Sequence, residues 1–146
     1  MAQKIHHFKG FSVVTDSVDI EVNMKQTENN FNKAQYVLDS AIMTSMVPFM
    51  PMQTGQFIAV TKGMSSAIAG TGQVVAAAPP TGRFLYEGNA MVGRYSKSAW
   101  AKKGEKKVLS GASLSYNRGG QHWFDKAKAK DCDNWVRITK KTAGGG

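Results

Sequence analysis

The residues of this sequence best suited to metal binding or proton transfer are three histidines, His6, His7 and His122. Histidine serves as a metal ligand or as a general acid and base near neutral pH. His6 and His7 are adjacent, so on extended backbone their side chains point to opposite faces. His122 has no histidine or cysteine near it at metal-ligand spacing. The histidines therefore predict no metal site.

The single cysteine, Cys132, is the only candidate thiol nucleophile. It stands between Asp131 and Asp133, and two neighbouring carboxylates raise rather than lower the pKa of a thiol. The ten carboxylates are spread thinly, and no glycine-rich stretch continues into the Gly-Lys-Ser/Thr of a phosphate-binding loop. We therefore expect no catalytic residues, no bound cofactor and no metal. A small enzyme with an unrecognised site is the least supported alternative.

Charge is distributed unevenly along the 146 residues, which carry a net charge of +9. Residues 1–82 hold five basic and five acidic side chains, whereas residues 83–146 hold fourteen basic and five acidic ones. A basic patch attracts nucleic acid, acidic protein surfaces or anionic lipid, or is simply a solvated surface. The sequence has no apolar run long enough to span a bilayer, and residues 1–10 contain no apolar stretch of the secretory kind. With its lone cysteine, this predicts a soluble protein of a reducing cytoplasm.

Two long segments carry apolar residues at helical spacing, at about 27–46 and 121–140. Pro48 and Pro51 follow the first segment and should end it. The apolar positions of the two helices are Phe31, Ala34, Leu38, Ala41, Ile42 and Met46, then Phe124, Ala127, Trp135 and Ile138. These are the strongest secondary-structure predictions of the sequence.

Four shorter segments predict strands: 18–22, 57–61, 72–78 and 83–87. In the first, Val18, Ile20 and Val22 alternate with acidic residues, which indicates one wet face. Residues 64–69 fit either a connection between strands or a helical turn.

Residues 88–121 predict a long exposed loop that folds back, as a hairpin ending near 108–116. We predict an α+β fold in which two amphipathic helices pack on a small, mostly antiparallel sheet. The expected organisation is an N-terminal arm and short strand (1–26, loose over 1–10), one α+β domain (27–140) and a flexible tail (141–146).

Several side chains in connecting segments are candidates for contact with a partner. Met50 and Met52 lie beside prolines, and methionine adapts to irregular surfaces. Basic residues stand near aromatic ones in three places, which could stack bases and bind phosphates: Arg94 with Tyr95, Lys97 with Trp100, and Arg118 with Trp123. Their spacing fits no RNA-binding motif, so the interpretation of Trp100 and Trp123 as core or interface anchors is favoured.

Three segments carry motifs of low individual specificity. The first directly follows the long helix and contains Pro51, Thr54, Gly55 and Phe57. The others contribute the following positions: Pro80, Arg83, Tyr86 and Gly88, then Trp123, Phe124 and Ala127. In this order and spacing they resemble the minor capsid and head–tail connector (neck, tail-completion) proteins of tailed bacteriophages. Phe57 stands where that family usually has leucine, and Thr81-Gly82 replaces a usual Tyr-Ala.

The resemblance covers roughly residues 27–140. It implies a structural virion protein, present in the host cytoplasm during assembly, whose copies form a ring in the neck. That ring would join the portal side of the capsid to the tail, and the protein would have no enzymatic activity. Expected partners are other copies, head-closure or adaptor proteins, and tail-terminator or tail-tube proteins. DNA would pass through the ring without specific binding, and no membrane would be involved.

A positive lumen would hold passing DNA, so most lysines of the basic half should face outward or meet acidic partners. They are Lys102, Lys103, Lys106, Lys107, Lys126, Lys128, Lys130, Lys140 and Lys141. We also expect that deleting residues 88–118 leaves the helices folded but abolishes incorporation into virions. The main alternative function is a small basic nucleic-acid-binding protein; a capsid decoration or tail-terminator protein is a related one.

Overall fold

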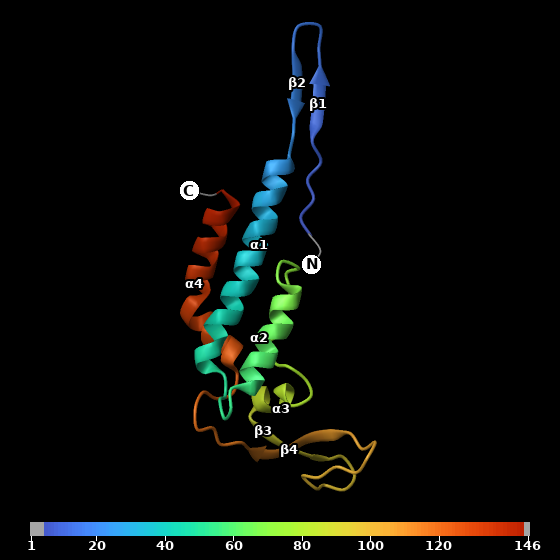
Figure 1. Cartoon of the computed structure of the whole chain (residues 1–146), viewed down its shortest axis with the longest axis vertical. Coiled ribbons are helices and arrows are strands. Elements are labelled where there is room, and N and C mark those ends of the chain that lie inside the picture. Colours follow the sequence, from blue (N-terminus) through green and yellow to red (C-terminus); the bar gives the residue numbers. More distant parts are fainter. Residues whose placement is uncertain (1–4, 145–146) are drawn as a thin grey trace.

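The computed structural model describes residues 5–144 as an elongated helical body with a hairpin projecting from each end (Figure 1). The elements, in chain order, are β1 (Phe11–Val14), β2 (Asp19–Val22), α1 (Lys25–Met46), the 3-10 helix η1 (Val47–Phe49), α2 (Gln56–Ile68), α3 (Gly82–Glu87), β3 (Asn89–Gly93), β4 (Lys107–Ser113) and α4 (Trp123–Ala143). The predicted α+β class is confirmed.

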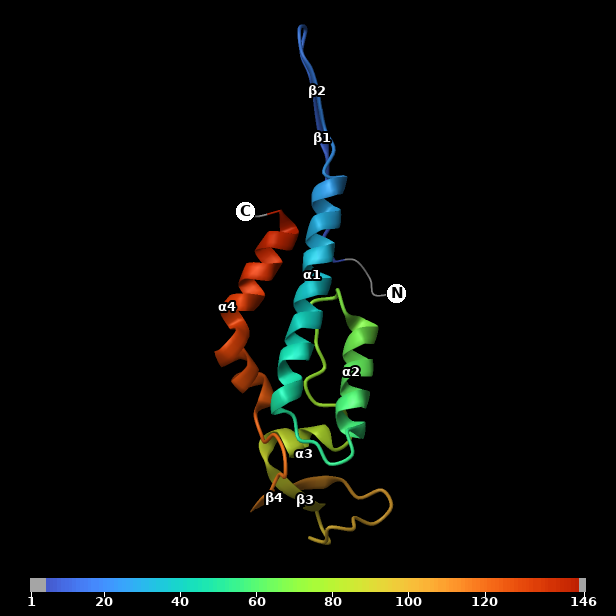
Figure 2. The ribbon, with the colours of Figure 1, turned by 60° about the vertical axis from the view of Figure 1, so that its left-hand side comes forward.

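The strands form two separate antiparallel pairs, β1 with β2 and β3 with β4. The helices pack on one another instead of on a shared sheet: α4 runs antiparallel to α1 on one side, and α2 lies on another (Figures 1 and 2). The sequence predicts two helices covering one sheet. Each described strand pair is too narrow to cover the apolar stripe of a 22-residue helix, so the helices cover one another instead.

The core lies where the ends of α1 and η1 meet the beginning of α4. Its buried residues are Met43, Met46, Met50, Trp123, Ala127 and Trp135. The Trp135 indole nitrogen donates a hydrogen bond to Ser45 Oγ at 3.0 Å, so this large ring is buried without an unsatisfied donor. Phe124 stacks on Trp135 with ring centroids 6.4 Å apart. Most of the predicted apolar positions of both long helices thus lie in or against the core. Phe31 is an exception, because it is 39% exposed and contacts His6 and Phe8 instead.

A buried carboxylate joins α1 to the segment after α2. Asp39 Oδ2 accepts hydrogen bonds from the backbone amides of Gly70 at 2.8 Å and Gly72 at 3.0 Å, and Oδ1 accepts one from Gln35. Gly70 and Gly72 both have positive φ, which turns their amides toward one carboxylate. Asp39 therefore has a structural role.

The predicted helices at 27–46 and 121–140 are confirmed as α1 and α4, and the strand at 18–22 as β2. The strand predicted at 57–61 is wrong: these residues lie in α2, which also covers most of 64–69. Their β-branched residues favour a strand, but packing against the core overrides this weak preference.

Two further strand predictions are wrong. Residues 72–78 have no regular structure, and 83–87 form α3, which Gly88 ends with φ of 71°. The predicted 88–121 loop is not wholly irregular, because β3 and β4 make the expected hairpin within it.

The terminal predictions also need correction. Residues 5–10 have no regular structure but are held on α1, since Asn32 exchanges hydrogen bonds with the backbone of His6. At the other end the helix continues to Ala143, so 141–143 are not a flexible tail. The remaining parts of the predicted arm and tail, residues 1–4 and 145–146, lie outside the described residues.

Candidate functional site

The three motif segments meet around the side chain of Trp123, at the first turn of α4. Trp123 is completely buried, and its ring makes edge-on contacts with Phe57 of α2 at 5.7 Å and Tyr86 of α3 at 4.8 Å between ring centroids. Its indole nitrogen donates to the carbonyl oxygen of Ala76 at 2.7 Å. Residues from three distant parts of the sequence thus share one packed cluster.

Two motif glycines sit where the backbone requires them. Gly55 caps the start of α2 with φ of 80°, and Gly88 caps the end of α3 with φ of 71°. Residues with a Cβ atom adopt this left-handed region at a cost of about 1 kcal/mol or more. A Cβ atom at Gly88 would also overlap the side chain of Gln121, just before α4. These motif glycines therefore set the positions of the helices that carry Phe57 and Tyr86.

The other motif positions are divided between the core and the surface. Ala127 is buried, Pro51 and Phe124 are partly buried, and the exposed positions are Thr54, Pro80 and Arg83. The exposed ones lie at the same end of the body, where α1 is connected to α2 and where α3 begins. They are available for contact with other molecules.

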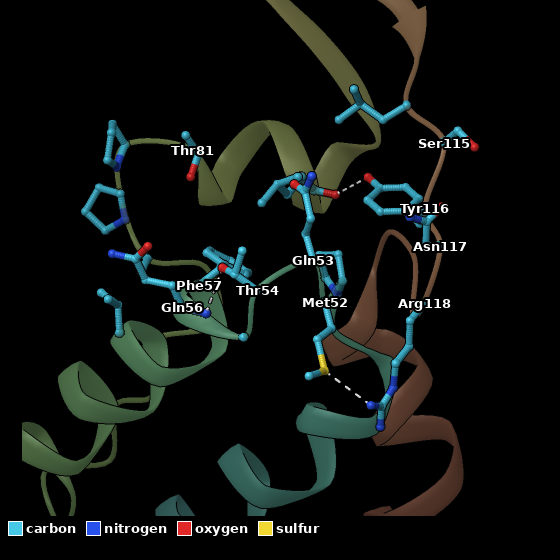
Figure 3. Close-up of a pocket in the computed structure, with 18 residues that line it drawn as sticks. Met52, Gln53, Thr54, Gln56, Phe57, Thr81, Ser115, Tyr116, Asn117 and Arg118 are labelled. Atoms are coloured by element: carbon cyan, nitrogen blue, oxygen red, sulfur yellow. Dashed lines mark hydrogen bonds between the residues drawn. The ribbon is translucent and has the colours of Figure 1, made fainter.

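A pocket of about 610 Å³ opens beside this cluster, between the connection from α1 to α2, the segment before α3, and residues 114–118 (Figure 3). Tyr116 lies on one wall, where its hydroxyl donates to the carbonyl oxygen of Leu85 at 2.5 Å. Arg118 contacts the sulfur of Met52 across the same wall at 3.2 Å. The pocket combines apolar and polar side chains and contains motif residues Thr54 and Phe57.

Two tyrosines near the pocket stay protonated over a wider pH range than free tyrosine. Burial raises the pKa of Tyr116. Burial also raises the pKa of Tyr86, with a further contribution from the negative charge of Asp125, whose carboxylate accepts its hydroxyl hydrogen bond at 3.2 Å. Both hydroxyls therefore act as hydrogen-bond donors here, which is a structural role.

The suggestion that Met50 faces a partner is wrong. Met50 is fully buried in the core, and its carbonyl oxygen lies against Gly119, where a Cβ atom would come within 2.2 Å. Met52, by contrast, is 41% exposed at the rim of the pocket. Of the two methionines, only Met52 can contact another molecule in this conformation.

The loop between β3 and β4 presents the other candidate contact residues. Tyr95 is 81% exposed and Trp100 is 88% exposed, and the Arg94 guanidinium lies 5.8 Å from the centre of the Tyr95 ring. Trp100 is therefore not a core residue of the isolated chain. Such strongly exposed aromatic side chains favour a role in binding.

Glu105 organises this loop. Its carboxylate accepts hydrogen bonds from the backbone amides of Tyr95 and Ser96, both at 2.7 Å, and from that of Lys102 at 3.1 Å. Hydrogen bonds from Ser96, with those from Lys102 and Tyr95, lower the pKa of Glu105 to about 2. The loop is thus an ordered turn around one carboxylate.

The nine lysines of the basic half, named above, are exposed in the single chain except for Lys107, which is partly buried. Lys130 lies 5.9 Å from the centre of the Phe49 ring. That most of these lysines face outward or meet acidic partners in an assembly stays a prediction.

The histidines and the cysteine do not come together. His6 lies against Phe31, His122 precedes α4 with Nδ1 3.7 Å from Asp125, and Cys132 is partly buried within α4. Within residues 5–144, no three histidine, cysteine or acidic side chains are placed to hold a metal ion. In the same part of the chain, no helix combines the length and apolarity needed to cross a bilayer.

Sequence reasoning missed Glu105 and Tyr116 as residues of these surfaces, and it named Arg118 only as a basic neighbour of Trp123. The one acidic residue among the lysines of the loop was a usable signal for Glu105. The contacts of Tyr116 and Arg118 had no comparable signal, because their partners Leu85 and Met52 are 31 and 66 residues away in the sequence.

Comparison with known proteins finds no matching family model, no matching curated protein and no matching solved structure.

Proposed function

We propose that this chain is a structural subunit of a tailed bacteriophage, and that its copies form a ring in the neck between capsid and tail. The observation that carries the proposal is the meeting of the three motif segments at Trp123. A fold that these three motifs define jointly requires their side chains to pack together, and Phe57, Tyr86 and Trp123 meet this requirement.

The form of the subunit supports the same proposal. A ring subunit needs a stable body and separate surfaces for two neighbours, because a head-to-tail interface uses different patches on each copy. Here the body is the α1–α4 core, and hairpins with exposed apolar or aromatic residues project from opposite ends (Figure 2). The expected partners are further copies, head-closure or adaptor proteins, and tail-terminator or tail-tube proteins.

The experiment is electron microscopy of particles made in cells that produce the other structural proteins, with and without this chain. The proposal predicts that DNA-filled heads without tails accumulate when the chain is missing, and that adding the purified protein restores tailed particles. Normal tailed particles made without the chain would contradict it.

A shortened variant tests the surface contribution while keeping the fold. Arg94 and Lys106 face each other across the hairpin, where the amide of Arg94 donates to the carbonyl of Lys106 at 3.0 Å. Replacing residues 95–105 by Asn-Gly gives a two-residue turn that suits this pairing. We expect this variant to fold but fail to restore tailed particles. The exposed replacement Asp133→Ala is the control, and it should restore them fully.

One observation favours a second function. The loop at 94–107 combines six basic side chains with the exposed rings of Tyr95 and Trp100, which suits phosphate binding and base stacking. A nucleic-acid-binding protein would bind DNA in isolation, with an affinity that falls steeply as salt increases. Strong binding lost on Trp100→Ala, together with normal particles made without the chain, would establish this function in place of the first.

A further inference from the structure

The two projecting hairpins carry opposite charges. Residues 11–22, which form the β1–β2 hairpin, contain three carboxylates and no basic residue, although Lys9 and Lys25 stand at its base. Residues 94–107, which join β3 to β4, contain six basic side chains and one carboxylate. The two hairpins lie at opposite ends of the long axis of the molecule (Figures 1 and 2). One copy cannot bring them together.

The β1–β2 hairpin also exposes an apolar face. Its register places Phe11 opposite Val22 and Val13 opposite Ile20, so these four side chains lie on one face. Phe11 is 59% exposed, Val13 46% and Ile20 48%. A two-stranded hairpin alone in water is only marginally stable. This one therefore gains stability from any surface that covers the apolar face.

The basic loop offers a surface of matching chemistry. Trp100 and Tyr95 supply exposed aromatic area beside the lysines. The only carboxylate of the loop, Glu105, is already held by the backbone amides around it. Because Glu105 is occupied in this way, the exposed lysines around it are free to attract carboxylates from another molecule.

We propose that a second copy of this chain occupies both surfaces: the acidic β1–β2 hairpin of one copy docks on the basic β3–β4 loop of the next. This inference rests on the proposed ring and names its contact. The interface is heterologous, as a ring of identical subunits requires. Opposite charges guide the two surfaces together, and the aromatic rings cover the apolar face.

Other occupants fit less well. Two β1–β2 hairpins packed through their apolar faces would cover those faces but would leave the basic loop of each copy without an acidic partner. A nucleic acid could bind the basic loop, but it could not bind the acidic hairpin, whose apolar face would stay exposed. A second copy supplies a partner of opposite charge for both surfaces through one contact.

The first test exchanges the charges. Asp19→Lys with Glu21→Lys makes the first hairpin basic. The two positions pair with Val14 and Ser12, so their side chains lie on the face opposite the apolar one. Lys102→Glu with Lys103→Glu makes the exposed tip of the loop acidic. Association of the full chain is measured by sedimentation at low salt.

The wild-type chain should self-associate, and added salt should weaken that association. Each charge-reversed variant alone should associate at least about tenfold more weakly, and an equimolar mixture of the two should recover the loss. A wild-type chain that stays monomeric at low salt, variants that associate like the wild type, or a mixture without recovery would each overturn the inference.

The second test joins the partners covalently. A carbodiimide links a lysine to a carboxylate that touches it, and mass spectrometry identifies the joined peptides. We expect links between 11–22 and 94–107, and a mixture of isotope-labelled and unlabelled chains should show that they connect different copies. Links only within one labelled copy, or none between these two segments, would contradict the contact.

These tests are independent of the neck role. If the purified chain does not associate but particles without it lack tails, the inference fails and the proposed function stands. If the chain associates as described but normal tailed particles form without it, the proposed function fails.

Discussion

The indole nitrogen of Trp123 donates a hydrogen bond to the carbonyl oxygen of Ala76 at 2.7 Å, joining the start of α4 to the segment between α2 and α3. Because Trp123 has no solvent exposure, water cannot replace this bond if the donor is removed. The Trp123 side chain thus both fills the cluster and fixes the start of α4 against the segment between α2 and α3.

Trp123→Phe should lower the free energy of unfolding by about 2–4 kcal/mol, because it removes the donor and leaves a smaller ring in the same space. The measurement is unfolding in urea, followed by circular dichroism. Trp100→Phe is the matched control: Trp100 is 88% exposed, and its replacement should change stability by less than about 0.5 kcal/mol. Equal effects of the two replacements would show that Trp123 does not anchor the cluster.

Asp39→Ala should destabilise the fold by about 3 kcal/mol, because the amides of Gly70 and Gly72 would lose their shared acceptor in a buried setting. Asp133→Ala, at an exposed position of α4, should have little effect. Calorimetric melting of both variants compares them. A similar melting temperature for the two would contradict the structural role of Asp39.

Two glycines with similar backbone conformations allow the cost of a left-handed backbone to be measured apart from the cost of a steric overlap. Gly119 has φ of 74°, and a Cβ atom would meet the carbonyl of Met50; Gly104 has φ of 85° and open space around it. Gly104→Ala should cost only about 1 kcal/mol, for the left-handed conformation. Gly119→Ala should cost about 3 kcal/mol or more, since the backbone must also move. Equal costs in urea unfolding would mean that the Met50–Gly119 approach is not tight.

The loop around Glu105 should be sensitive to strong acid. The pKa of Glu105 is lowered from 4.5 to about 2, so the carboxylate stabilises the folded loop fully above pH 4.5. That contribution is lost as the pH falls through about 2. The amide proton signals of Tyr95 and Ser96 in NMR spectra should follow this titration. In the Glu105→Gln variant, the amide proton signals of Tyr95 and Ser96 should be shifted at neutral pH and should show no such titration. A titration midpoint near pH 4.5 in the wild-type protein would exclude the hydrogen-bonded carboxylate.

The elements best predicted from the sequence were those whose pattern is local and long. Residues 27–46 and 121–140 repeat apolar residues over several turns, and they are α1 and α4. The segment at 57–61 gave a false strand because its five residues are too few to show a helical period, and Phe57 is placed by contact with Trp123. Residues 83–87 are equally short, and Gly88, which ends α3, also suits a turn after a strand.

The candidate site was predictable only in part. Tyr95 and Trp100 could be named as candidates for partner contact, but the sequence also allowed a core position for Trp100, which is 88% exposed. The burial of Met50 could not be predicted, because Met50 packs in a core cluster with Trp123, which is 73 positions along the chain. The strand β1 was also missed, although Phe11 and Val13 alternate with Ser12 before the turn at 15–18.

The most direct measurement of the central claim is the location of this chain in mature particles. A variant with a short C-terminal tag, labelled with gold and viewed by electron microscopy, should show the label at the junction of head and tail. Protein analysis of the same purified particles should find several copies per particle. Label spread over the capsid surface would indicate a decoration protein. Absence of the chain from purified particles would contradict a structural role in the neck.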